Sequence, residues 1–129
     1  MAYKLEWADR AVFCRWSGTV VGGDLVTANQ QIHSDARFDD LRYMLFLMND
    51  VEQMDISIES IEQVAAMGIG AAKSNENLRC AMVSISDDMY GLASFYQMHM
   101  DEAGGPTWAM KLFRNEAAAN DWLFEELVV

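Results

Sequence analysis

The sequence predicts an α/β fold: a mainly parallel, five-stranded mixed sheet with four helices, in the order β-β-α-β-α-β-α-β-α. Two observations lead to this prediction. Strand-like apolar runs alternate along the chain with segments whose apolar residues recur at helical spacing. The links between these segments are short, which favours right-handed crossovers between neighbouring parallel strands.

The first three elements follow from alternation and capping. Residues 3–7 and 10–17 alternate between apolar and polar side chains, which indicates two strands joined by a turn. Asp24 is placed to cap a helix that runs to about Ser34. The inner side of that helix is expected to carry Leu25, Ala28 and Ile32.

The middle of the chain supplies two buried strands and a helix. Residues 41–49 and 78–86 are apolar with little alternation, as expected of strands that are covered on both faces. Between them, a helix is predicted from Ser57 or Ile58 to about Ser74. Its inner positions at helical spacing are Ile61, Ala65, Gly68 and Ala72.

The last third repeats the pattern. Residues 88–102 form a predicted helix, 103–106 a turn, and 107–114 the fifth strand. Asn115 is placed to cap the closing helix. Its inward residues are expected to be Ala118, Trp122 and Leu127.

Length and composition favour a single domain over residues 1–129. A chain of this size can bury about two-thirds of its unfolded surface, so its core requires no metal or disulfide. Apolar residues make up 52% of the chain and proline occurs once, which argues against disorder. No apolar run is long enough for a membrane span, and the charged N-terminus does not resemble a signal peptide. Cys14 and Cys80 are therefore expected to be buried thiols of a cytoplasmic protein.

The charge of the chain excludes one class of partner. Acidic residues number 20 and basic residues 9, giving a net charge of −11. Nucleic-acid binding requires a basic surface that neutralises phosphates, and none is present. An anionic membrane would also repel this chain, so neither partner is expected.

No motif specifies an enzyme, a cofactor or a metal site. Residues 68–74, GIGAAKS, resemble a phosphate-binding loop, but Lys73 stands where the second glycine is required. We interpret Gly68 and Gly70 as positions of close helix packing. His33 and His99 lie in different predicted helices, and neither has a second histidine at ligand spacing.

The third predicted helix is rich in aromatic and methionine side chains. These candidates for an apolar-ligand site are Tyr90, Phe95, Tyr96 and Met100, together with Trp108 at the next strand. The simpler interpretation is that they fill the core. Because both sides of the helix carry large residues, a homodimer partner or a small apolar ligand is a further hypothesis. In the second case the chain would be a carrier or sensor of a ligand such as a lipid, bound beside this helix.

Four stretches in order resemble the SpoIIAA-like, or STAS, group of anti-sigma-factor antagonist domains. They are WSGTVVGGDL at residues 16–25, LFLMNDVEQMDIS at 45–57, LRCAMVSIS at 78–86 and KLFRNEAAANDWL at 111–123. Together they cover nearly the whole chain. The resemblance implies a SpoIIAA-like fold and a regulatory, protein-binding role without catalysis.

The resemblance also implies where such a role would reside. In classical antagonists an Asp-Ser pair opens a signature helix, and a kinase phosphorylates that serine. Here Ile56 follows Asp55, and the serines are displaced to Ser57 and Ser60. We interpret Ser57 as a helix cap rather than a phosphorylation switch, because a phosphate there would be surrounded by acids. The candidates for partner contact are Asp50, Asp55, Ser57 and Ser60.

Overall fold

The computed structural model describes residues 2–102 and 108–124. Its strands are β1 (Tyr3–Ala8), β2 (Ala11–Val21), β3 (Tyr43–Asp55), β4 (Arg79–Val83) and β5 (Ala109–Phe113). Its helices are α1 (Gly22–Ser34), α2 (Ile58–Ala72), α3 (Asp87–Glu102) and α4 (Glu116–Leu123), with a short 3-10 helix, η1, at Phe38–Asp40. The predicted order of elements and the mixed, mainly parallel sheet are confirmed.

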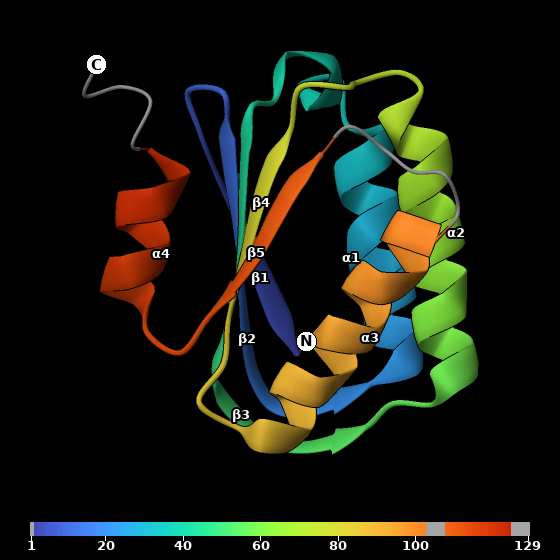
Figure 1. The fold of residues 1–129 in the computed structure, drawn as a ribbon, viewed down its shortest axis with the longest axis vertical. Coiled ribbons are helices and arrows are strands. Elements are labelled where there is room, and N and C mark those ends of the chain that lie inside the picture. The colour runs from blue at the N-terminus through green and yellow to red at the C-terminus, as the bar shows by residue number, and fades with distance from the viewer. Residues whose placement is uncertain (1, 103–107, 125–129) are drawn as a thin grey trace.

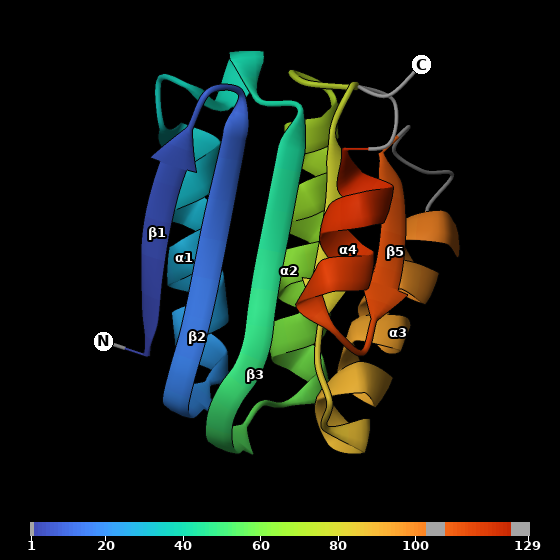
Figure 2. The ribbon, with the colours of Figure 1, turned by 90° about the vertical axis from the view of Figure 1, so that its left-hand side faces the viewer.

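The five strands lie in the sheet in the order in which they occur in the chain. β1 pairs with β2 in the antiparallel sense, and each later neighbouring pair is parallel. Each crossover therefore moves one strand further in the same direction. Since crossovers keep one hand, α1, α2 and α3 all lie on one face of the sheet, as Figure 1 shows. The last helix, α4, covers the other face against β3, β4 and β5 (Figure 2).

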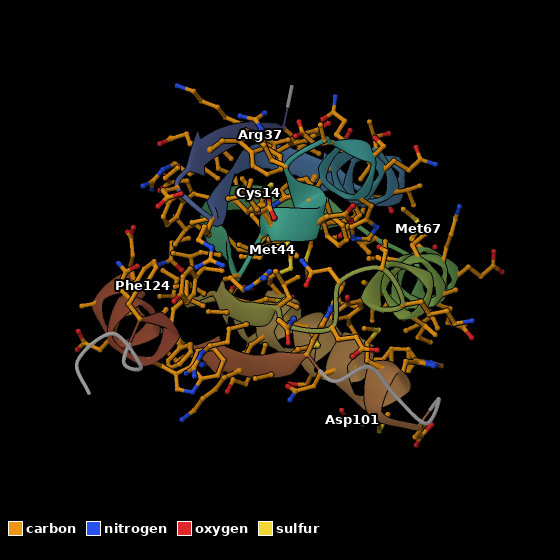
Figure 3. All side chains as sticks on the ribbon, turned by 90° about the horizontal axis from the view of Figure 1, so that it is seen from above. Cys14, Arg37, Met44, Met67, Asp101 and Phe124 are labelled. Atoms are coloured by element: carbon orange, nitrogen blue, oxygen red, sulfur yellow. The ribbon has the colours of Figure 1, made fainter. Side chains whose placement is uncertain are left out.

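Two apolar layers hold these helices to the sheet. The larger layer lies under α1–α3 and contains Cys14, Trp16, Met44 and Phe46. The smaller layer lies under α4 and includes Leu45, Leu47, Val83 and Leu123. In the view along the sheet (Figure 3), Met44 lies in the interior, whereas Asp101 points outward from α3. The first six residues of β3 are all buried, which confirms the prediction of a strand covered on both faces.

Several predicted boundaries were wrong, mostly at the ends of strands. β2 runs to Val21 instead of residue 17, and β3 runs to Asp55 instead of 49. β4 and β5 are shorter than predicted. α1 begins at Gly22, so Asp24 lies inside its first turn, where its carboxylate accepts a hydrogen bond from the Val21 N–H at 3.2 Å.

The inner side of α4 differs by one position from the prediction. Ala119 and Leu123 are buried, while Ala118 is half-buried. Trp122 is also half-buried, and its ring lies 4.3 Å from the Arg79 guanidinium carbon. Asn115 caps the helix as predicted, accepting a hydrogen bond from the Ala118 N–H at 2.8 Å. Leu127 and the predicted turn at 103–106 lie outside the described residues.

Candidate functional site

The starts of three helices meet at the end of the molecule where the parallel strands finish. β2 leads into α1, β3 into α2 and β4 into α3 at this end (Figure 1). Three apolar side chains remain exposed there, Val21 by 41%, Ile58 by 51% and Ile85 by 66%. We call this end the carboxyl-edge surface and define it by Val21, Asp50, Glu52, Asp55, Ser57, Ile58 and Ile85.

A two-stranded ribbon carries most of this surface. β4 pairs with β3 only as far as Leu47, opposite Val83, whereas β2 and β3 stay paired to Val21 and Asp55. Two bulges each add one residue to β3. The first lies between Leu47 and Asp50, which pair with Arg15 and Ser17. The second lies between Val51 and Gln53, which pair with Gly18 and Thr19. The side chains that turn toward the core consequently occur three residues apart, at Met48, Val51 and Met54.

The ribbon places two of the predicted contact residues in solvent. Asp50 lies opposite Ser17 in the register, and Asp55 lies opposite Val21. Both aspartates are exposed, as are Glu52 and Glu59. No lysine or arginine occurs in the sequence from residue 43 to residue 72. The ribbon and the start of α2 therefore carry negative charge without a basic side chain of their own. A basic side chain that reaches this end is Arg114, which donates to the Ile85 carbonyl at 3.2 Å and pairs with Asp87 at 2.9 Å.

The two predicted serines have different environments. Ser57 is the N-cap of α2, and its exposed hydroxyl accepts a hydrogen bond from the Ser60 N–H at 3.1 Å. The Ser57 and Ser60 hydroxyl oxygens lie 3.0 Å apart. Ser60 is half-buried because it packs against the main chain of Gly22 at the start of α1. The cap predicted for Ser57 is confirmed, and Ser60 is the less accessible of the two.

A small apolar cavity lies between the sheet and the helices, apart from the carboxyl-edge surface. Its volume is about 70 Å³. Sulfur-containing side chains line much of it, including Met44, Cys80, Met82 and Met110. This is about half of the roughly 150 Å³ of an apolar cavity that binds benzene. The cavity has room for a very small apolar molecule and none for a fatty acid.

The apolar-ligand candidates are not gathered at this cavity. Tyr90 and Tyr96 line it, and Met100 is buried nearby against Gly68. Phe95 instead packs edge-on against His99, with ring centroids 4.5 Å apart. Trp108 lies elsewhere, with Phe38 and His33. The close packing predicted at Gly68 is confirmed, whereas a side chain at Gly70 would meet no atom within 4 Å.

Sequence reasoning missed the polar residue that anchors Trp108. The buried Asn75 side chain donates hydrogen bonds to the carbonyl oxygens of Phe38 and Leu41, both at 2.8 Å. The main-chain carbonyl of Asn75 accepts a hydrogen bond from the Trp108 indole N–H at 2.6 Å. Asn75 follows a helix in the sequence, where asparagine is common, so no local signal distinguished it.

Burial is the main cause of the shifted pKa values of the two thiols and of His33. Cys14 and Cys80 are both free and buried, as predicted. Burial raises the pKa of Cys14 to about 12 and also raises the pKa of Cys80. Burial lowers the pKa of His33 to about 4, and its Nε2 atom has no hydrogen-bond partner. Among the described residues, no three His, Cys, Asp or Glu side chains gather as a metal site.

Similarity to known proteins lies in the fold. No family model and no curated protein matches the sequence. The structure is similar to the anti-sigma factor antagonist SpoIIAA in its unphosphorylated form, with a TM-score of 0.56 and 18% identity over 94% of this chain and 96% of that one. It is also similar to the phosphorylated form of SpoIIAA, the Bacillus cell fate determinant, with a TM-score of 0.56 and 15% identity over 94% of this chain and 98% of that one.

The chain has a SpoIIAA-like fold. A DUF3478 family protein from Shewanella loihica PV-4, itself described as having this fold, matches with a TM-score of 0.55 and 12% identity over 95% of this chain and 92% of that one. The SpoIIAA-like fold predicted from four sequence stretches is thus confirmed at the level of structure. Within this fold, no helix of the described residues is both long and apolar enough to cross a membrane.

Proposed function

We propose that this chain is a non-enzymatic, cytoplasmic regulatory domain that acts by binding another protein through the carboxyl-edge surface. The observation that carries the proposal is the exposure of Val21, Ile58 and Ile85 together at one end of the molecule. Exposed apolar side chains surrounded by charged ones are typical of protein-binding surfaces.

The fold supports the same role. Two of the structural neighbours are forms of SpoIIAA, an anti-sigma factor antagonist, and one of them is phosphorylated. A domain with this role would regulate its partner protein by binding to it. The acids Asp50 and Asp55 would orient the partner by charge, while the exposed apolar residues supply the buried contact.

In this proposal the contact does not require phosphorylation. The Ser57 hydroxyl already accepts a hydrogen bond at the start of α2. A phosphate at that position would lie among Asp55, Glu59 and the other acids of the ribbon, with no basic side chain close in sequence to receive it.

A capture experiment tests the proposal. The tagged chain is used to recover partners from extracts of cells that express it, beside an Asp50→Lys, Asp55→Lys variant. We expect one recovered protein to be lost with the variant and retained with Asp101→Lys, Asp121→Lys, which changes the charge equally at exposed sites on α3 and α4. Equal recovery with both variants would contradict the proposal.

The homodimer hypothesis concerns a different surface. The outer side of α3 exposes Met98 by 49%, which makes this helix the place for a second copy to pack. Sedimentation of the wild-type chain and of Met98→Lys tests it. A dimer that the substitution dissociates would support the hypothesis, and a monomer at high concentration would contradict it.

The second candidate function is a carrier or sensor of a very small apolar ligand. The apolar cavity beside α3 favours it, because Tyr90 and Tyr96 line a space of about 70 Å³. Native mass spectrometry and NMR under xenon pressure would test it. Shifts centred on Met82 and Tyr96 would support the idea, whereas a dry, unresponsive cavity would contradict it.

A further inference from the structure

The outer edge of β3 is open beyond the point where β4 leaves the sheet. β4 pairs with β3 up to Leu47 and Val83. Beyond that pair, the Ile85 N–H donates a hydrogen bond to the Asn49 side-chain oxygen at 2.9 Å instead of to a main-chain carbonyl of β3. Residues 50–55 of β3 continue for a further six positions with β2 as their partner on one side.

The main chain of this stretch has unused hydrogen-bonding groups. In the part of the chain that the structure describes, the main-chain groups of residues 50–55 form no hydrogen bonds outside the ladder with β2. In a parallel ladder, roughly half of the N–H and C=O groups of a strand point toward each neighbour. The groups that point away from β2 therefore form an open strand edge.

Such an edge is a template for one more strand unless it is blocked. Two of the usual blocking devices do not occur in this stretch, because residues 50–55 contain no proline and no lysine. The bulges twist the ribbon but leave it paired to Asp55. Figure 1 shows the ends of β2 and β3 curving together beneath the helices.

The side chains around the edge indicate the chemistry of the added strand. Asp50, Glu52 and Asp55 are exposed along it. Exposed apolar residues stand at either end, Ile85 beside Asn49 and Ile58 after Asp55. A second copy of this chain would bring acids against acids, given its net charge of −11, whereas a basic segment would be attracted.

We propose that the open edge of β3 at residues 50–55 binds a basic, extended segment of the partner protein as an additional β-strand. The proposal rests on the proposed function, because it specifies how a partner engages the carboxyl-edge surface. Main-chain hydrogen bonds supply the register, and alternate side chains of the segment meet the acids.

A synthetic peptide tests the strand. The probe is a capped peptide of about eight residues in which lysine and valine alternate, the length of an ordinary strand. A matched peptide carries N-methyl groups on two of its lysines and two of its valines, which removes main-chain donors from both edges of the strand without changing the charge. We expect the methylated peptide to bind at least about tenfold more weakly in fluorescence anisotropy, because several hydrogen bonds are lost.

The position of binding is measured by NMR on the full chain. Amide shifts and slowed hydrogen exchange at residues 50–55 on addition of the lysine–valine peptide are expected. Equal binding of the methylated peptide, shifts confined to another face, or no binding at all would overturn the proposal. So would protection of residues 50–55 that depends on protein concentration without peptide, since a second copy would then be the occupant.

Charge variants separate this proposal from the proposed function. Glu52→Lys, Asp55→Lys should weaken binding of the lysine–valine peptide about tenfold, because attraction becomes repulsion at two places. The control Asp101→Lys, Asp121→Lys should leave it unchanged. The methylated peptide could bind as well as its parent while the charge variant still binds neither peptide well. That result would show that strand addition is wrong and would leave the proposed acidic contact surface supported. If capture of the natural partner ignores the charge variant, the proposed function fails.

Discussion

The side chain of Ser60 occupies the space beside Gly22, so that a Cβ added at Gly22 would lie 2.7 Å from the Ser60 Cβ. This contact joins the first turn of α1 to the first turn of α2. Because real Cβ atoms do not approach so closely, the two helix starts can lie this near each other only with glycine at position 22. The close approach lies directly beyond the ends of β2 and β3, where Val21 pairs with Asp55.

Gly22→Ala should therefore destabilise the domain. We expect a loss of about 1–3 kcal/mol in the free energy of unfolding, since the added methyl group forces the two helix starts apart. Gly23→Ala is the matched control, because a Cβ at Gly23 meets nothing within 4 Å. Urea denaturation of both variants measures the difference.

A double-mutant cycle identifies the cause. Ser60→Gly in the Gly22→Ala background removes the atoms that the new methyl group meets, so it should recover part of the lost stability. A purely additive result would show that the loss at Gly22 has another origin.

Ser57→Ala should weaken the start of α2. Its hydroxyl accepts a hydrogen bond from the Ser60 N–H. Removing an N-cap acceptor costs about 1 kcal/mol. Ser57→Asp keeps an acceptor but adds an acid beside Asp55, so its stability should lie above that of Ser57→Ala and rise with salt concentration. Thermal unfolding at two ionic strengths checks both expectations.

His33 should make stability depend on pH in the mildly acidic range. Burial lowers the pKa of His33 to about 4 from its ordinary value of 6.5, so the unfolded chain takes up a proton at a higher pH. Its contribution is complete above about pH 6.5, decreases as the pH falls toward 4, and changes no further below that. Because part of the ring is exposed, we expect a loss of about 1–2 kcal/mol.

Denaturation of the wild type and of His33→Gln between pH 4.5 and 7.5 measures this contribution. The difference in unfolding free energy between the two proteins should change with pH in the stated direction. Parallel pH profiles would show that His33 is not the responsible group.

Both thiols should react slowly in the native protein. Cys14 and Cys80 are buried, and burial raises both pKa values, so little thiolate is available to an alkylating reagent. Labelling by iodoacetamide should accelerate in urea in step with unfolding. Rapid labelling of either cysteine in buffer would contradict the burial described for it.

Asn75→Leu should be among the more damaging single substitutions. Its side chain donates to the carbonyl oxygens of Phe38 and Leu41 inside the protein. Leucine would remove both of these hydrogen bonds and the one that the Asn75 side-chain oxygen accepts from the Asn77 N–H, at a cost of about 2–4 kcal/mol. The Phe38 and Leu41 carbonyls would keep one donor each, the Leu41 N–H and the Arg42 guanidinium. Asn77→Leu is the control on the same connection, because Asn77 contributes its main-chain N–H to the contact with Asn75. Calorimetry of both variants distinguishes the loss of the Asn75 side-chain hydrogen bonds from a general effect of leucine in this connection.

The sequence predicted well those elements in which the spacing of apolar residues equals the repeat of the helix or strand that they form. α2 shows this: Ile61, Ala65 and Gly68 recur at helical spacing and are buried. The end of β3 shows the opposite case. Its bulges space the inward residues Val51 and Met54 three apart, so the stretch loses the alternation by which a strand is recognised.

Within the candidate site, the sequence predicted only those roles that depend on residues nearby in the chain. Ser57 could be identified as a cap because capping depends on the residues that follow it in the chain. The exposure of Ile85 and the open edge of β3 depend on where β4 leaves the sheet, which is a tertiary property. Trp108 was misplaced for the same reason, since its partner Asn75 lies 33 positions away in sequence.

The long pairing of β2 with β3 also bears on how the chain folds. Ala11 pairs with Tyr43, and the whole of α1 lies between the two strands. Closing so large a loop is slow, because the chain entropy that it costs is offset only when α1 has packed over the sheet. A chain in which β2 and β3 have not yet paired has no ribbon, so recognition through the ribbon edge would select molecules in which this pairing is complete.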